Sequence, residues 1–172
     1  MKTERLQMMD QLTVDRTESL YPRLRKPGYV IQYLNHAISE EKEEECPGLL
    51  ALSLSQVIQA NSDLIFVPYL LVPMYSIHLS LEDNLTLIDV LEETFKEDKE
   101  EIRPIVNLLE QHYLLTKKGH HLKQVKITFR ATITYEDGTQ EELSGVELIK
   151  WLKPESVQNP DYNEWESALK VA

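Results

Sequence analysis

The most constraining feature of this 172-residue chain is an alternation of apolar and polar residues that continues from Val125 to Tyr135. Successive side chains of a β-strand point to opposite faces, so this pattern predicts a strand with one buried and one solvated face. The following Glu136-Asp137-Gly138 permits either a two-residue Asp-Gly turn or a three-residue loop with a bulged glycine. Only the three-residue loop pairs Ala131 with Leu143 on the apolar face, so we predict that register.

The residues that follow this hairpin have the local signals of a helix start. Ser144 and Glu147 match a capping box, and Pro154 ends the predicted helix after Leu152. Because strand, turn and cap all agree with one local fold, the segment is typical of architecture rather than of a strained active site. We expect a large cost from Phe129→Ala if that ring lies in the core.

A second alternating stretch, Tyr75–Leu81, predicts another half-buried strand. Upstream of it, Pro68 and Pro73 exclude a central strand, so we predict an extended edge or crossing segment over Ile65–Val72.

Apolar residues three and four positions apart predict helices elsewhere in the chain. These helices cover 29–45, 48–63, Asp83 or Asn84 to Thr94, and Pro104 to Leu115, where Lys117-Lys118-Gly119 forms a helix end. The predicted fold is therefore α+β, a small, mostly antiparallel sheet with helices packed on one face. Breakers divide the chain into a helical N-terminal arm (1–26), a core domain (27–153) and a C-terminal tail (154–172). Trp165 in that tail favours a short helix docked on its own domain over one that binds a partner.

The charge of the chain is unevenly distributed. The net charge of −11 argues against broad nonspecific binding to nucleic acid, and residues 81–101 contain nine acids against two lysines. We interpret this excess, with the acids after Tyr135, as a recognition face for a basic protein partner. The predicted acidic face consists of Glu92, Glu93, Glu97, Asp98, Glu141 and Glu142.

Residues 102–130 are basic, and IRPIVNLLEQHYLLTKKGHHLKQVKITF is typical of a helix followed by a strand, a Lys-Lys-Gly turn and a strand. This order resembles the last helix and wing of a winged-helix domain, over about 45 residues and without a diagnostic motif. The resemblance implies nucleic-acid binding through Lys117, Lys118, Lys123, Lys126 and Arg130. The alternative is that Lys126 and Arg130 pair across the sheet with acids such as Glu141.

The sequence contains no recognised catalytic constellation. Its five histidines lack a metal-binding spacing, its five glycines fall at breaks or caps, and no serine, lysine or cysteine lies in a nucleophile motif. The single cysteine, Cys46, excludes an intramolecular disulfide and favours a reducing, cytoplasmic location. The charged N-terminal residues are unlike a signal peptide, and the longest apolar stretch, Leu64–Tyr75, is too short to span a bilayer.

We therefore expect a protein without metal, cofactor or enzymatic activity. The leading hypothesis is a protein-interaction module, namely an adaptor, an inhibitor or a subunit of a bacterial or phage assembly, that uses the acidic face. The alternatives are the winged-helix-like nucleic-acid binder and, third, an enzyme of unrecognised type.

Overall fold

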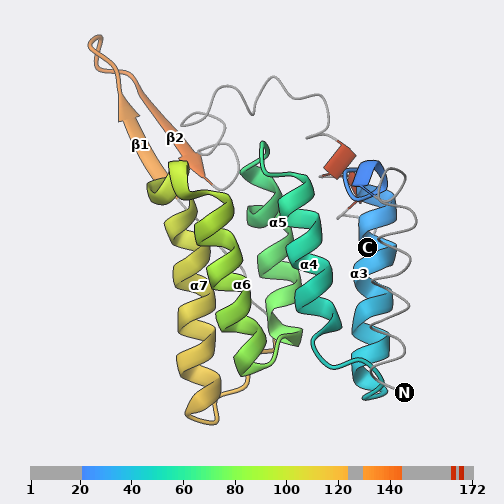
Figure 1. Ribbon diagram of the computed structural model, residues 1–172. Helices are drawn as coiled ribbons and strands as arrows, with labels where there is room; N and C mark the ends of the chain where they lie inside the picture. Colours follow the sequence, from blue (N-terminus) through green and yellow to red (C-terminus); the bar gives the residue numbers. More distant parts are fainter. Residues whose placement is uncertain (1–20, 124–129, 145–163, 166, 169–172) are drawn as a thin grey trace.

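A computed structural model describes residues 21–123, 130–144, 164–165 and 167–168 (Figure 1). Its body is a bundle in which each of the helices α3 to α7 runs antiparallel to the one before it. The helices are α3 (Pro27–Lys42), α4 (Leu49–Ala60), α5 (Phe66–Tyr75), α6 (Leu81–Thr94) and α7 (Lys99–Lys117), with short 3-10 turns η1 (Ser76–His78) and η2 (Lys96–Asp98). Contacts place α4 between α3 and α6, and α6 between α4 and α7.

The α+β class is confirmed, since helices lie to one side of a two-stranded antiparallel sheet of β1 (Arg130–Thr134) and β2 (Gln140–Ser144). The predicted register is also confirmed, because Ala131 faces Leu143. Beyond the two strands, the Tyr135 amide donates a 2.9 Å hydrogen bond to Thr139, so the reversal itself consists of the three residues Glu136, Asp137 and Gly138. Gly138 adopts a φ of 85° that favours glycine. Ala131, Ile133 and Leu143 share the half-buried face.

The strand predicted over Tyr75–Leu81 is wrong. These residues form the end of α5, the turn η1 and the start of α6. Tyr75, Ser76 and Leu79 are the buried residues of this stretch, and their spacing of one and four positions is helical rather than alternating. A polar residue, Ser76, thus occupies a fully buried position that the apolar pattern had assigned to solvent.

The extended segment predicted over Ile65–Val72 is wrong as well, because α5 is helical. Pro68 lies in its first turn, where a helix tolerates proline, although Pro73 lies in its interior. The helix buries apolar side chains on several sides, among them Phe66, Val67 and Leu71. Such all-round burial has no amphipathic period by which sequence could identify a helix.

Two helix starts differ from the prediction. Ser80, rather than Asp83 or Asn84, caps α6, and its hydroxyl accepts a hydrogen bond from the Asp83 amide at 3.2 Å. Helix α7 begins at Lys99, five residues before its predicted start at Pro104. The residues between the two predicted helices therefore form η2 and the first turns of α7.

The tail of the chain contributes to the core through Trp165, which is completely buried. This burial confirms the prediction that Trp165 packs on its own domain rather than on a partner. The capping box at Ser144, the helix predicted to follow it and Phe129 involve residues outside the described ranges. The segment boundaries at residues 26 and 153 stay predictions.

Candidate interaction surface on α6 and α7

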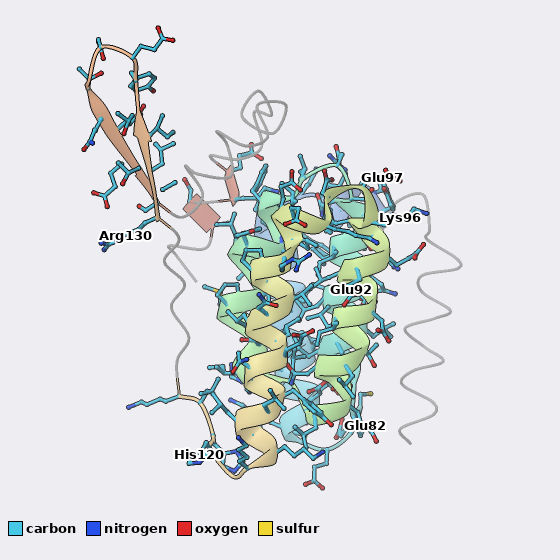
Figure 2. The ribbon with its side chains drawn as sticks, turned by 90° about the vertical axis from the view of Figure 1, so that its left-hand side faces the viewer. Glu82, Glu92, Lys96, Glu97, His120 and Arg130 are labelled. Carbon is cyan, nitrogen blue, oxygen red and sulfur yellow. The ribbon has the colours of Figure 1, made fainter. Side chains whose placement is uncertain are left out.

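The solvent side of α6 is acidic along its whole length. Leu87 and Leu91 are buried and pack one side of the helix against the core. Glu82, Asp89 and Glu93 are exposed. Spacings of seven and four residues place these three carboxylates on one side of the helix. Figure 2 shows the progression from Glu82 at one end of the bundle to Glu97 on η2 at the other. We call Glu82, Asp89, Glu93 and Glu97 the acidic stripe.

Among the described residues, little basic charge neutralises this stripe. Lys96 approaches Glu93 to 3.7 Å, but the two side chains are 61% and 80% exposed. Exposed ion pairs of this kind contribute roughly 0–1 kcal/mol, so the pair leaves the field of the stripe largely intact. Glu97 forms no ion pair with another residue in the described part of the chain.

Beside the stripe, a groove of about 350 Å³ lies between α6 and α7. Its floor is apolar, since Ile102 and Val106 are only 2% and 7% exposed. Residues of α7 three and four positions apart form one wall, because that spacing places them on the same face of a helix. The lining consists of Glu92 from α6 and of Lys99, Ile102, Arg103, Val106, Asn107 and Glu110 from α7.

The structure brings together only part of the predicted acidic face. Glu93 and Glu97 belong to the stripe, Glu92 lies at the groove, and Asp98 is half-buried at the N-cap of α7. The hairpin carrying the other two acids stands apart from the helices (Figures 1 and 2).

Glu141 and Glu142 also point to opposite faces of the hairpin, because they are consecutive in β2. The Tyr135 hydroxyl donates a 2.7 Å hydrogen bond to Glu141. Arg130 faces Ser144 across the strands and lies on the other side of the sheet from Glu141, so the predicted pairing of these two charges is wrong.

The predicted basic surface is not assembled into one patch by the described residues. Lys117 is the last residue of α7 and Lys118 is its C-cap, next to His120, whereas Arg130 lies toward the opposite end of the bundle (Figure 2). Lys123 follows the end of α7, and Lys126 falls outside the described ranges.

The wing implied by the winged-helix resemblance is wrong at Lys-Lys-Gly, because this sequence ends a helix. The amide of Gly119 donates to Thr116 at 3.0 Å, and the amide of His120 donates to Leu115 at 2.9 Å. Gly119 has a φ of 88°, so these two bonds form a Schellman motif. This helix end is the one predicted from the same residues.

A second acidic surface, which the sequence did not single out as a site, lies where α3 ends and where α4 and α6 begin. Glu41, Glu44, Glu82 and Asp83 line a concavity of about 400 Å³ there. The Leu50 amide donates a 2.6 Å hydrogen bond to Glu41, and burial raises the pKa of that carboxyl. The available signal in the sequence was the run of acids over residues 40–45, which ends before Pro47-Gly48. Its proximity to α6 depends on the tertiary fold.

Of the five histidines, His112 on α7 is buried, and its pKa is lowered by that burial. Its Nδ1 has no hydrogen-bond partner among the described residues. An acid or base needs a substrate-accessible atom, so this position is typical of a packed residue rather than of a catalytic one.

The described residues contain no helix that is both long and apolar enough to cross a bilayer. Comparison of the chain with protein-family models, with characterised proteins and with solved structures gives no match.

Proposed function

We propose that this protein is a non-enzymatic interaction module that binds a basic protein partner through the acidic stripe of α6. The observation that carries the proposal is the stripe itself, four exposed carboxylates along one side of α6 and η2 that form, within the described residues, a single weak ion pair, to Lys96.

The physical advantage of such a stripe is kinetic. Like charges along one helix raise the free energy of the unbound protein, and a cationic partner removes that repulsion on binding. Electrostatic attraction between the stripe and a cationic partner accelerates their encounter, and salt weakens that attraction. An adaptor, an inhibitor and an assembly subunit all fit this chemistry.

The partner can be identified by photo-crosslinking. A photoreactive amino acid replaces Asp89 in the stripe, and the matched control replaces Glu43, an exposed acid at the end of α3. We expect position 89, and not position 43, to yield a covalent adduct with a basic protein in the cells that express this chain.

Binding to the identified partner then tests the stripe directly. Asp89→Lys with Glu93→Lys should lower the association rate at least tenfold at about 0.15 M salt. Glu43→Lys with Glu164→Lys changes the net charge equally at other exposed positions and should leave the rate within about twofold. Equal rates for the two double variants, both folded by circular dichroism, would contradict the proposal.

Two further double variants test the hairpin and the basic end of α7 as alternative binding surfaces. If Glu141→Lys with Glu142→Lys alone weakens binding, the hairpin is the recognition face instead of α6. If the crosslinked partner is absent but DNA or RNA binds at low salt and is lost with Lys117→Ala and Lys118→Ala, the nucleic-acid function replaces this proposal.

A further inference from the structure

The groove between α6 and α7 differs from the acidic stripe because it carries both signs of charge in equal number. Glu92 and Glu110 are acidic, and Lys99 and Arg103 are basic. Arg103 donates a 3.2 Å hydrogen bond to Glu100, but both side chains are more than half exposed. The other three charges form no ion pair with any residue in the described ranges. Charges of both signs are therefore free to meet opposite charges from outside.

The order of these charges along α7 is suited to a two-fold axis. Lys99 lies near the start of the helix, and Glu110 lies eleven residues later, about 16 Å along the axis. When two copies of α7 run antiparallel about a midpoint between residues 104 and 105, each Lys99 faces the Glu110 of the other copy. The same symmetry pairs the remaining wall residues, Ile102 with Asn107 and Arg103 with Val106.

We propose that the α6–α7 groove is an isologous interface in which a second copy of this chain docks with α7 antiparallel to α7. An isologous contact requires a self-complementary surface, and the opposed ends of this groove meet that requirement. The α6–α7 pairs of two copies would form a four-helix arrangement, a common way to bury such a seam.

Apolar contacts supplement these ion pairs. The aliphatic part of Arg103 can cover Val106 of the second copy, as long basic side chains commonly do at interfaces. Leu85, seven residues before Glu92 on α6, and Leu114, four residues after Glu110 on α7, continue the same sides of their helices. Both leucines are 46% exposed, so a docked copy would remove apolar surface from water.

The net charge of −11 opposes self-association at long range. At about 0.15 M salt this repulsion is screened beyond roughly 8 Å, whereas pairs in contact are screened much less. The inference does not depend on the acidic stripe, because the stripe lies on another side of α6 and would remain exposed in the dimer.

Sedimentation of the full chain over a range of concentrations at about 0.15 M salt tests the interface. We expect a reversible dimer whose dissociation constant rises at least tenfold with Lys99→Glu or with Glu110→Lys, because like charges then face one another. The double variant Lys99→Glu with Glu110→Lys restores opposite charges and should return the constant to within about threefold of the original.

Matched controls use two neighbouring exposed residues at the end of α3. Lys42→Glu and Glu43→Lys change the net charge by the same amounts as the groove variants, away from the groove, and should leave the dimer unchanged. A chain that stays monomeric throughout the concentration range would overturn the proposal. A dimer that the double variant fails to restore, with native circular dichroism, would overturn it equally.

Crosslinking provides a second, independent readout. Cys46 is buried, so Asn107→Cys introduces an accessible thiol at the groove, and a flexible bis-maleimide should then yield a covalent dimer. Gln32→Cys on the exposed side of α3 is the control and should yield none. Equal crosslinking from the two positions would contradict a dimer through α7.

Discussion

Arg25 donates two hydrogen bonds to Asp63, at 3.0 and 3.2 Å, from its two terminal nitrogens to the two carboxylate oxygens. The same guanidinium also donates to the carbonyl of Ala60, at the end of α4, at 2.8 Å. Leu24, beside Arg25, is buried. These contacts together hold the residues that precede α3 against the far end of α4.

We expect Arg25→Ala to lower the free energy of unfolding by about 1 kcal/mol, since the pair is partly exposed and only its planar geometry raises it above an ordinary surface pair. Chemical denaturation at neutral pH measures this change. Asp63→Asn serves as the partner variant, and the double variant should cost less than the sum of the two single changes. Strict additivity would show that the contact does not stabilise the protein.

The same pair predicts a pH dependence in acid. The hydrogen bonds from Arg25 lower the pKa of Asp63 below 3.8, its value in the unfolded chain. Stability from a carboxyl with a lowered pKa is present above the unfolded value and is lost as the pH falls through the folded one. The advantage of the original chain over Asp63→Asn should therefore shrink below about pH 4. A constant difference down to pH 2 would contradict this assignment.

The buried His112 predicts a second pH dependence, nearer neutrality, which arises from burial of a base rather than from an ion pair. Burial lowers its folded pKa below 6.5, so the unfolded chain takes up a proton first as the pH falls. Stability is therefore unaffected well above pH 6.5 and declines as the pH drops from there toward the folded pKa. His112→Leu should remove this decline, measured as the difference between the two urea midpoints from pH 8 to pH 5. Parallel pH profiles would exclude His112 as the cause.

Gly138 predicts a purely conformational effect in the hairpin. A β-carbon there would meet no heavy atom within 4 Å, but φ is 85°, so Gly138→Ala costs roughly 1 kcal/mol from backbone strain alone. Faster hydrogen exchange of the Tyr135 amide, which donates to Thr139 at 2.9 Å, reports this loss. Gly28→Ala is the control, because that position is equally open and lies in α3, where alanine is favoured. Gly138→Ala should lower the free energy of unfolding, whereas Gly28→Ala should raise it.

Trp165 predicts a large loss of stability on truncation. Its ring is completely buried in the core, so Trp165→Ala should cost roughly 3–5 kcal/mol in urea unfolding. Leu114→Ala removes an apolar side chain that is 46% exposed and should change stability by less than about 1 kcal/mol. A small effect at Trp165 would mean that the tail does not hold its place in the core in solution.

The sequence alone determined those features whose physical cause is local. The register of Ala131 with Leu143 follows from the two-residue period of a strand and from a loop that needs a glycine at a positive φ. The end of α7 at Gly119 follows in the same way from helix capping. A helix over most of α6 was also predicted, although its start was placed at Asp83 or Asn84 and the observed cap is Ser80.

The tertiary structure alone decided features that depend on what surrounds a segment. The residues from Tyr75 to Leu81 alternate as a strand would, but seven residues are too few to exclude the turn and helix start that packing selects. The prolines of α5 excluded a central strand correctly, yet only burial on several sides of the segment favours a helix there.

Surfaces follow the same division. Glu93 and Glu142 belong to separate parts of the structure, and Lys117 and Arg130 lie toward opposite ends of it, although each pair had been assigned to one face. The groove exists only because α6 and α7 pack antiparallel and bring Glu92 beside Lys99 and Arg103. Charge and period are properties of a segment, whereas proximity is a property of the packed chain.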